Sequence, residues 1–509
     1  MAGDRSSAPA QARRALASGS CVHGGRSVSY PRTRPLARRV GPKPGGSGLP
    51  MSAIIDSTQR PPAPAEAGAA ALAVGAAERA IVLDAGGGVP LARFLAEVRG
   101  LAAMLPDRPY AVNLCEDRYR FLVAFCAVAA RGQTTLLPPS RTRAAIEEVR
   151  AHHPDSYCLG DSEPCACDAG LAPLPHFVRV PDPLPQAPGA MPKVEDAHVA
   201  AVGYTSGSTG APKANPKRWR DFRAGAAQNA AALADLFGGA APGVVATVPA
   251  QHMYGVEMSV LFPLLAGAAV HRARPFFPDD IAAALRECPA PRLLVTTPVH
   301  LRVLVESGVA LPPLAAVVSA TAPLPAELAR AAEARLGCEV RELFGSTETC
   351  IIARRRTAHE DAWTLLPGVR LHPQPDGTGV EADHLAAPVV LADLMQLLPD
   401  GRFLLRGRQA DLLEIAGKRA SLGDLTRRLL AIPGVQDGAV VQLDACDASG
   451  VRRIAAVAVA PDLDEAAILG ALRRSVDPVF MPRRLRLVTA LPRNETGKLP
   501  RAELMALLR

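Results

Sequence analysis

The sequence contains few lysines. Six lysines stand among 57 basic residues, and arginine fills almost every other basic position. The six are Lys43, Lys193, Lys213, Lys217, Lys418 and Lys498. A lysine ammonium is a compact charge on a flexible stem, and an arginine cannot replace it at every site. We therefore expect some of these lysines to mark positions where the chemistry requires an ammonium group.

Long apolar runs and zinc-binding spacings are also absent. No stretch of eighteen apolar residues occurs, which predicts that the chain has no membrane span. The run Met258–Val270 is shorter and predicts a buried helix. The ten cysteines are scattered, and Cys158, Cys165 and Cys167 with two neighbouring histidines match no standard zinc pattern. We interpret the cysteines as the reduced thiols of a cytoplasmic protein.

The excess positive charge lies in one segment. Residues 1–50 hold nine basic residues and one acidic residue, so the net charge of +8 belongs to them and the remainder is balanced. The basic pI therefore describes a tail and predicts no nucleic-acid partner. This segment is rich in Arg, Ser, Gly and Pro, which predicts disorder. It could be a transit peptide, or translation could start at Met51. Residues 60–75 continue as a Pro/Ala linker.

The length predicts more than one domain, because single hydrophobic cores stop growing near roughly 250–300 residues. From about residue 80, short apolar strands alternate with helical segments, which predicts an α/β fold with parallel-rich sheets and flanking helices. After about residue 405 the pattern changes to a compact α+β unit. We expect a tail and linker over residues 1–75, a large N-terminal domain over 76–408, and a small mobile C-terminal domain over 409–509.

The expected elements follow from apolar periodicity and turn residues. Residues 161–195 hold many Pro and Asp and predict an irregular connection. The expected helices are Glu116–Arg131, Arg141–His152, Gly255–Leu265, Asp279–Glu287, Val299–Val305, Ala326–Arg335, Gly423–Ala431 and Glu465–Ser475. The expected strands are Tyr110–Leu114, Gln133–Leu137, Ser156–Leu159, Ala200–Tyr204, Val244–Val248, Ala268–His271, Leu293–Thr296, Ala315–Ser319, Glu339–Leu343, Leu412–Ile415, Ala439–Leu443, Ile454–Val459 and Leu485–Val488.

The stretch Tyr204–Lys213, YTSGSTGAPK, predicts a phosphate-binding loop. Glycines let backbone N–H groups approach an anion closely, and successive N–H groups can surround phosphate oxygens. Hydroxyls add donors and the lysine adds a positive charge. The order of a Walker A loop is absent. The residues expected to hold phosphate are Thr205, Ser206, Gly207, Ser208, Thr209, Gly210 and Lys213. A shorter Gly/Ser run could equally be a polar surface loop.

The whole ten-residue string resembles the phosphate loop of the adenylate-forming superfamily, which includes acyl-CoA synthetases, nonribosomal adenylation domains and luciferases. The resemblance covers roughly residues 80–509, with further motifs in the family's order. Phe344–Glu348, FGSTE, resembles the family's aromatic-Gly-x-Thr-Glu motif. It implies that Glu348 binds Mg²⁺, a hard cation that prefers oxygen ligands. It also implies that Thr347 donates to the α-phosphate, and that Phe344 and Gly345 lie beside the nucleotide.

Two further stretches resemble the family's nucleoside-binding segments. Ser319–Leu324 stands where the family has a small-residue loop against the adenine, so Thr321 and Ala322 are expected there, with Thr in place of the usual Gly. In Ala392–Arg408, the resemblance implies that Asp393 binds the ribose hydroxyls and that Arg408 contacts ribose or phosphate. We interpret Asp400-Gly401 as a hairpin turn.

The C-terminal motifs resemble the loops that exchange between two half-reactions in the family. Leu412–Leu425 implies thiol access at Gly417 and a charge-holding Arg419. Pro492–Leu504 implies that Lys498 bridges the incoming carboxylate and the α-phosphate and stabilises the developing charge. Alone, Lys498 could be a solvated turn lysine. Two departures, Ala410 at the hinge and Glu414 in the next strand, leave the details of domain rotation open.

The segment Val248–Tyr254 indicates the type of acid. Acyl and aryl acid ligases of the family carry a histidine near the substrate carboxylate, and His252 with Gly255 approximates that pattern. The Phe-Asp pair of amino-acid adenylation domains is absent, which disfavours amino-acid substrates. A core histidine is the alternative. The sequence after Lys213, which contains Lys217 and Trp219, is similar to the corresponding stretch of short ligases from aryl polyene pigment pathways. By position, the candidate pocket walls are Tyr254, Met258, Val299, Ser319 and Phe344.

The resemblance thus implies a cytoplasmic acid–thiol ligase that uses ATP and Mg²⁺. It would activate an aryl or medium-chain carboxylic acid to an acyl-adenylate with release of pyrophosphate. The acyl group would then pass to the thiol of CoA or of a carrier protein. The expected catalytic residues are Lys498, Glu348, Thr347 and His252. The alternatives are a non-catalytic nucleotide- or acyl-binding homologue, and an adenylating enzyme with a non-thiol acceptor.

Overall fold

The computed structural model describes most of the chain. The described residues are 68–162, 174–206, 212–375, 377–408, 412–415, 418–446, 452–494 and 497–509. All of them belong to one unit, Pro64–Arg509. Among these residues there is no helix with the length and apolar character that crossing a membrane requires.

A six-stranded sheet contains the first βαβ units. Its order is β10-β9-β5-β4-β6-β7, and every pair is parallel except β10 with β9. The strands are β4 (Tyr110–Asn113), β5 (Thr134–Leu137), β6 (Ser156–Gly160), β7 (Phe177–Arg179), β9 (Val199–Ser206) and β10 (Pro212–Arg218). This sheet confirms the predicted βαβ alternation and leads directly into the expected phosphate loop.

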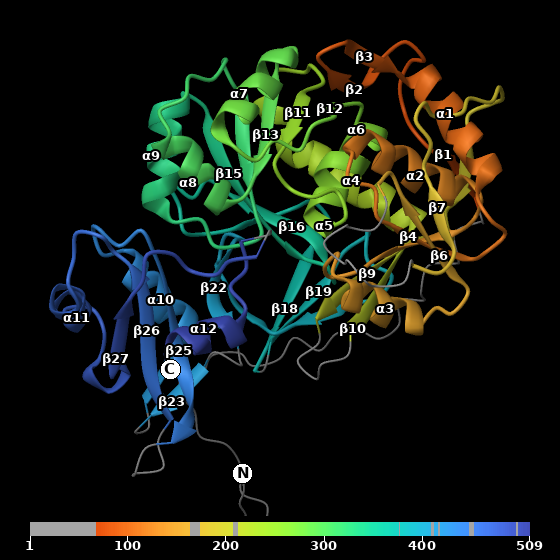
Figure 1. Ribbon diagram of the computed structural model, residues 1–509. Coiled ribbons are helices and arrows are strands. Elements are labelled where there is room, and N and C mark those ends of the chain that lie inside the picture. Colours follow the sequence, from red (N-terminus) through yellow and green to blue (C-terminus); the bar gives the residue numbers. More distant parts are fainter. Residues whose placement is uncertain are drawn as a thin grey trace, which may run out of the picture. The chain divides into compact units, whose positions relative to one another are not determined.

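A nine-stranded sheet forms the second layer, in the order β17-β16-β15-β14-β13-β11-β12-β2-β3. The six strands from β15 to β2 are parallel, and antiparallel strands extend both edges. Figure 1 shows β2 beside β12, which come from distant parts of the sequence. The strands are β2 (Ala80–Asp84), β3 (Gly87–Pro90), β11 (Gly243–Ala246), β12 (Ala269–His271), β13 (Arg292–Thr296), β14 (Ala316–Ser319), β15 (Glu339–Ser346), β16 (Cys350–Arg355) and β17 (Thr364–Leu365).

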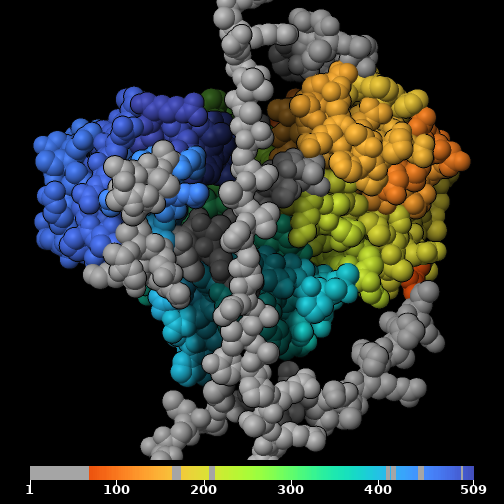
Figure 2. Space-filling view, turned by 90° about the horizontal axis from the view of Figure 1, so that it is seen from below, coloured from red at the N-terminus to blue at the C-terminus, as the bar shows by residue number. Residues whose placement is uncertain are grey.

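Helices cover both sheets and share one large apolar core. On one face of the nine-stranded sheet, α7 (Pro278–Glu287), α8 (Pro298–Glu306) and α9 (Ala326–Leu336) pack into a separate cluster (Figure 1). The core that both sheets share contains α1 (Leu91–Met104), α2 (Arg118–Ala130) and α4 (Trp219–Leu233). On the outer face of the six-stranded sheet lies α3 (Arg143–Ala151). The orange surface of the first helices adjoins the yellow-green surface of the segment that leads into α4 (Figure 2). The α/β prediction with parallel-rich sheets is confirmed.

Three local predictions differ from the structure. β1 (Ala69–Ala71) pairs with β8 (Lys193–Glu195), and Leu72 is fully buried, so the linker prediction is wrong for residues 69–75. The connection predicted as irregular contains β7 and β8. The helix expected over Gly255–Leu265 consists of α5 (Met253–Val256), a π-helical turn (Glu257–Leu261) and α6 (Phe262–Leu265). β1 consists of three alanines and has no alternation of apolar and polar residues, so periodicity could not reveal it.

Strands also occupy residues 370–408, where only a turn was expected. β21 (Asp393–Leu397) and β22 (Phe403–Arg408) form a hairpin whose turn contains Gly401 at φ +81°, which confirms the predicted Asp400-Gly401 turn. Beside it lies a small antiparallel sheet of β18 (Arg370–Gln374), β19 (Gly377–Glu381) and β20 (Val389–Leu391).

The C-terminal elements form apolar clusters of their own. These clusters contain buried residues from Leu413 to Leu508. The elements are β23 (Leu412–Ile415), β24 (Lys418–Ser421), α10 (Leu422–Leu430), β25 (Asp437–Cys446), β26 (Arg452–Val459), α11 (Glu465–Arg473), β27 (Arg484–Leu487) and α12 (Arg501–Leu507). Apart from β24, which was not predicted, they match the predicted elements to within a few residues. The domain boundary near Arg408–Asp411 stays a prediction.

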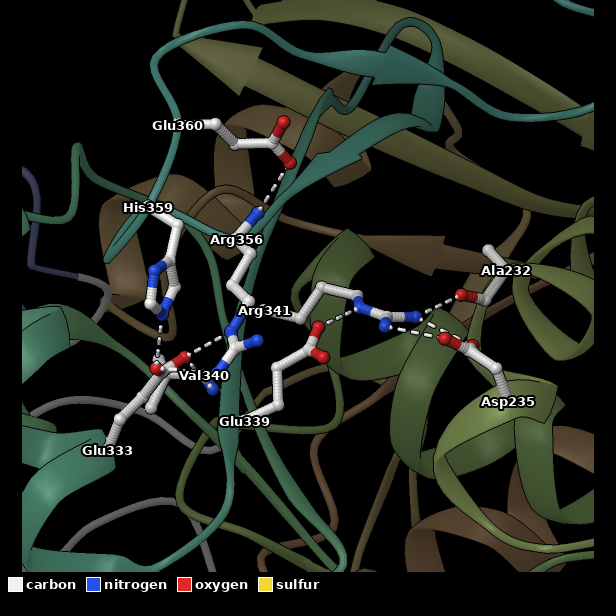
Figure 3. A network of polar contacts seen from close by, with 9 residues as sticks. All are labelled: Ala232, Asp235, Glu333, Glu339, Val340, Arg341, Arg356, His359 and Glu360. Atoms are coloured by element: carbon white, nitrogen blue, oxygen red, sulfur yellow. Dashed lines mark hydrogen bonds and ion pairs between the residues drawn. The ribbon is translucent and has the colours of Figure 1, made fainter.

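Charged side chains anchor the beginning of β15, the strand that leads into the FGSTE motif. The side chain of Arg341 is buried and donates to Ala232 O at 2.6 Å and to both carboxylate oxygens of Asp235 at 2.9 and 2.8 Å (Figure 3). On the other side, Glu333 accepts from Val340 N at 3.0 Å and from Arg356 at 2.9 Å. These bonds fix the start of the strand and hence the position of its far end.

Candidate active site

Four neighbouring strands of the nine-stranded sheet deliver predicted site residues to one edge. β11, β13, β14 and β15 are consecutive parallel neighbours, so their carboxyl ends lie together. In open α/β sheets this edge is where ligands bind. His252 follows β11, Val299 follows β13, Thr321 follows β14, and Glu348 follows β15. Four stretches that are distant in the sequence therefore meet at one place.

The predicted phosphate loop connects β9 to β10. The antiparallel register pairs Lys213 with Thr205 and Pro212 with Ser206, and Lys213 is exposed. The loop residues Gly207, Ser208, Thr209 and Gly210 and the side chain of Ser206 lie outside the described residues. A hairpin fixes both ends of the loop, so its two flanking residues, Thr205 and Lys213, stand side by side.

The phosphate loop and the FGSTE motif are in contact. The Thr205 hydroxyl donates to Glu348 Oε1 at 3.3 Å. Two residues earlier in β9, a Cβ built on Gly203 would lie 2.8 Å from Thr347 Cγ2 and 3.0 Å from Met253 Cε. A side chain at position 203 would therefore displace the motif. Two sheets thus meet at Glu348, and the hydroxyl of one loop reaches the carboxylate of the other.

The loop between β15 and β16 is closed by its own side chains. Ser346 and Thr349 exchange hydrogen bonds, with Thr349 N donating to Ser346 Oγ at 3.2 Å and Ser346 N to Thr349 Oγ1 at 3.2 Å. A Cβ built on Gly345 would lie 2.2 Å from Cys350 O, so only glycine fits where the strand pairing shifts register. The predicted Glu348 and Thr347 project from this closed turn, both half-buried.

The small-residue loop after β14 contains an unusual backbone conformation. Thr321 has φ +80°, in the left-handed region that β-branched residues seldom adopt. The family's glycine at this position would adopt it readily. Leu324 N, at the end of the loop, donates to buried Glu342 Oε1 at 2.9 Å. The loop that contains Thr321 and Ala322 is therefore held against β15, beside the motif of Glu348.

The hairpin β21–β22 brings the two predicted ribose residues opposite each other. Its register pairs Asp393 with Arg408, whose side chain lies outside the described residues. Trp363 and Phe403 exchange backbone hydrogen bonds at 2.8 and 3.0 Å and stack at 6.3 Å. Phe344 packs on both rings, at 5.4 and 6.2 Å. This aromatic group connects the hairpin to the FGSTE strand.

The environment of His252 is positively charged. Burial, together with the nearby charges of Lys498, Arg274 and Arg141, lowers the pKa of His252 to about 4. The imidazole is therefore neutral at physiological pH and can accept or donate one hydrogen bond. Of the other predicted pocket walls, Tyr254, Met258 and Ser319 are buried, and Tyr254 donates to Val318 O at 3.2 Å.

Lys498 lies in a turn that approaches the same edge. Lys498 N donates to Asn494 Oδ1 at 2.9 Å, and a Cβ built on the adjacent Gly497 would lie 3.4 Å from Val299 Cγ2. Arg493 donates to Gly497 O at 2.8 Å and pairs with Asp437 at 2.6 Å. Arg419 is paired with Glu414 in the register of the β23–β24 hairpin, but its side chain and Gly417 lie outside the described residues.

A protein-family model matches the part of the chain that contains this site. Residues 114–401, more than half of the chain, match the model described as AMP-binding enzyme. The chain belongs to this family. The match begins at the end of β4 and ends in the β21–β22 turn, so it includes the phosphate loop, the FGSTE motif and Asp393.

Several curated relatives of the chain are CoA ligases by name. The chain is 33% identical over 303 residues to a 4-coumarate–CoA ligase from Rhodobacter capsulatus, covering 58% of this chain and 74% of that protein. It is 28% identical over 389 residues to a sulfoacetate–CoA ligase from Cupriavidus necator, covering 66% and 74%.

Solved structures share the fold. The amide bond synthetase of Marinactinospora thermotolerans has a TM-score of 0.70 at 19% identity, covering 85% of this chain and 97% of that chain. The o-succinylbenzoate CoA synthetase of Bacillus subtilis in complex with its acyl-adenylate also has a TM-score of 0.70 at 19% identity, covering 84% and 95%. At this identity the likeness concerns the fold, and it confirms the predicted fold class.

The predictions of the adenylate-forming family and of an acid–thiol ligase are therefore confirmed at the level of the family. The aryl polyene subtype stays a prediction, as do the individual site residues.

Sequence reasoning missed several residues that hold the site. Lys217 was noticed only as part of a sub-family pattern, yet its buried ammonium donates to the main chain of Glu348. Glu257, inside the apolar stretch after His252, was not singled out, although a carboxylate in a buried helix is a recognisable signal. Gly203 and Arg493 stand next to the predicted motifs but have no distinguishing pattern of their own.

Proposed function

We propose that the protein is an ATP-dependent acid–CoA ligase that activates an aryl carboxylic acid through an acyl-adenylate. The observation that supports this most directly is the contact of Thr205 with Glu348, which joins the phosphate loop to the metal-binding motif. Several relatives named 4-coumarate–CoA ligase favour an aryl acid and CoA over a medium-chain acid and a carrier protein. A cytoplasmic location stays a prediction.

The site fits a magnesium ion that arrives with ATP. Within the described part of the chain, no group of three or more His, Cys, Asp and Glu side chains is gathered to bind a metal. Mg²⁺ commonly uses one or two carboxylates together with substrate phosphates and waters. Glu348 supplies one carboxylate and Thr205 a neighbouring hydroxyl, so Glu348 is the proposed ligand. The ion would neutralise phosphate charge there.

In the first half-reaction, an oxygen of the substrate carboxylate bonds to the α-phosphorus of ATP. The bond from that phosphorus to the bridging oxygen breaks, and pyrophosphate leaves. Lys213 and the loop after Thr205 bind the phosphates, and Thr347 donates to the α-phosphate. Lys498 stabilises the charge that the carboxylate and the α-phosphate share as they join. His252, neutral because of its environment, can face the carboxylate without holding it in a fixed ion pair.

The nucleoside would lie across the ends of β14 and β15 and the β21–β22 hairpin. Thr321, Ala322, Phe344 and Gly345 would contact the adenine, and Asp393 with Arg408 the ribose. In the second half-reaction the CoA sulfur, having lost its proton, bonds to the acyl carbon, and AMP leaves with the bonding electrons. Gly417 and Arg419 belong to that step.

The test is pyrophosphate release from Mg·ATP with a panel of aryl and straight-chain acids, each with and without CoA. Acid-dependent release with aryl acids and formation of the acyl-CoA would support the proposal. Release that needs an amine in place of CoA would identify a non-thiol acceptor. Measurable ATP binding without release for any acid would contradict the ligase function and favour the binding-protein alternative.

A further inference from the structure

The loop that carries Glu348 is held in a fixed shape. It runs from Ser346, the last residue of β15, to Ile351 in β16. Cys350 has φ +58°, in the left-handed region, which a residue with a Cβ adopts only when its surroundings impose it. The hydrogen bonds between Ser346 and Thr349 close the loop from within, and further side chains contact it from outside.

Three buried side chains from three separate segments contact successive backbone groups of this loop. Lys217 Nζ, from β10, donates to Glu348 O at 2.6 Å. His384 Nε2 donates to Thr349 O at 2.7 Å. Glu257 Oε1, from the π-helical turn, accepts from Ile351 N at 3.0 Å. The exposed fractions of these three side chains are 4% for Lys217, 1% for His384 and 4% for Glu257.

Burial of these groups is costly. Desolvation raises the pKa of Glu257 to about 7 and lowers that of His384. Asn229 Nδ2 also donates to Glu257, at 3.3 Å. A buried charged group that loses its partner strongly destabilises a protein, because the charge stays buried without compensation. Apolar side chains of similar size would leave Glu348 O, Thr349 O and Ile351 N without these hydrogen bonds, so the three polar side chains hold this stretch of backbone in place.

The targets of the three side chains are specific. Each bonds to the backbone of Glu348 or of a residue within three positions of it, and Lys217 bonds to the carbonyl of Glu348 itself. We propose that Lys217, His384 and Glu257 are positioning residues that set the orientation of the Glu348 carboxylate for Mg·ATP. This inference rests on the proposed role of Glu348 as the metal ligand.

The experiment measures the dependence of pyrophosphate release on free Mg²⁺ at fixed ATP and acid. Lys217→Met removes the donor and keeps the length of the side chain. Glu257→Leu removes the acceptor, whereas Glu257→Gln keeps an acceptor oxygen and is its matched control. Arg223 lies on α4 and forms an ion pair with Asp196, so Arg223→Met controls for loss of a positive charge. Glu348→Gln serves as the reference for direct loss of the ligand.

A second measurement does not depend on turnover. Calorimetry gives the dissociation constant of ATP with and without Mg²⁺ for each variant, and thermal unfolding reports folding. We expect Lys217→Met and Glu257→Leu to raise the half-saturating Mg²⁺ about tenfold, corresponding to about 1.4 kcal/mol. In the same two variants, Mg²⁺ should strengthen ATP binding less than it does in the original protein. In Arg223→Met and Glu257→Gln, the effect of Mg²⁺ on ATP binding should be close to that in the original protein. If Lys217→Met does not fold, the Glu257 pair decides.

Two results would overturn the proposal, and they can be told apart. In the first, Lys217→Met lowers the unfolding temperature but leaves the Mg²⁺ dependence unchanged, whereas Glu348→Gln shifts that dependence. Glu348 would then remain the ligand, and the role of Lys217 would be structural. An unchanged Mg²⁺ dependence in Glu348→Gln itself would refute the metal role of Glu348 and the positioning role together. Acid-dependent pyrophosphate release in the original protein would still show the ligase activity in either case.

Discussion

The two loops that carry the proposed charge-stabilising residues are held in different ways. The loop of Glu348 is fixed by three buried side chains. The loop of Lys498 is anchored by the pair of Arg493 with Asp437, whose side chains are 21% and 27% exposed. Hydrogen bonds to buried charged groups contribute about 1.5–3 kcal/mol, whereas exposed ion pairs contribute about 0.2–1 kcal/mol.

This difference matches the demands of the two half-reactions. In the proposed mechanism, Mg·ATP binds and AMP departs at the sheet edge, so Glu348 can keep one position throughout. The same mechanism needs Lys498 in the site for the transition state of adenylation and elsewhere for that of thiol transfer. Arg493 and Asp437 both lie among the C-terminal elements, so the turn of Lys498 can move with them, and one site can then serve two steps by gating.

Loss of Lys498 should have the largest effect and would separate the two steps. We expect Lys498→Ala to lower acid-dependent pyrophosphate release by about 100-fold or more, as found when a charge-stabilising donor is removed. Transfer from a supplied acyl-adenylate to CoA should be unchanged. Single-turnover assays of each step make the comparison. Equal losses in both steps would mean that Lys498 does not act in adenylation alone.

A bulkier residue in β9 should disturb the fixed loop. In Gly203→Ala the new Cβ would lie 2.8 Å from Thr347 Cγ2, so the side chain of Thr347 must move. Because small displacements of reacting groups can lower rates up to about 100-fold, we expect pyrophosphate release to fall about tenfold or more. Gly470→Ala in α11, where the Cβ would meet no atom within 4 Å, is the matched control. A normal rate in Gly203→Ala would show that the fixed loop tolerates movement.

A loosened anchor of the Lys498 loop should have a smaller effect. We expect Arg493→Gln to reduce the rate of adenylation a few-fold, because a partly buried pair with two hydrogen bonds is lost, and to leave thiol transfer unchanged. Asp437→Asn should do the same. Since the two residues are partners, the double variant should be no slower than either single one. Additive losses would mean that the pair does not act as a unit.

The sequence was informative where residue type and chemistry coincide. The Gly/Ser/Thr string before Lys213 and the carboxylate after β15 were recognisable because their chemistry needs those residues. The packing of two separate sheets, which the sequence does not reveal, brings them together. β10 was missed because its sequence, PKANPKR, contains two prolines and two lysines, which are depleted in strands. It forms an edge of its sheet, where proline is tolerated.

The supporting residues could not be predicted for a different reason. Lysine is almost always exposed, so nothing in the sequence indicated that Lys217 is 4% exposed. Its partner is a main-chain carbonyl, and a main-chain group leaves no trace in residue type. His384 and Glu257 lie 35 and 94 residues along the chain from the residues that they contact, so only the folded structure brings them to the motif.

The pH dependence of stability tests whether the Lys498 loop lies near His252 in solution. His252 has a pKa of about 4 in the folded protein, below its ordinary value. As the pH falls from about 6.5 to 4, the unfolded chain takes up a proton that the native state does not, so stability is lost over that window. Denaturant unfolding should show this loss, and His252→Gln should reduce it. Lys498→Ala should raise the pKa of His252, measured by NMR; no change would place the loop farther away.

The smallest expected effect concerns the backbone of the adenine loop, which belongs to the fixed part of the site. Thr321 has φ +80°, a conformation that costs a residue with a Cβ about 1–3 kcal/mol. Thr321→Gly removes this strain, but glycine loses about 0.5–1 kcal/mol more conformational entropy on folding. We therefore expect a net gain of about 1 kcal/mol in the free energy of unfolding. Thr321→Ala keeps the strain and should show no gain. A loss of stability in Thr321→Gly would mean that interactions of the Thr321 side chain outweigh the strain, and that this loop is held by them as firmly as the loop of Glu348 is held by its buried neighbours.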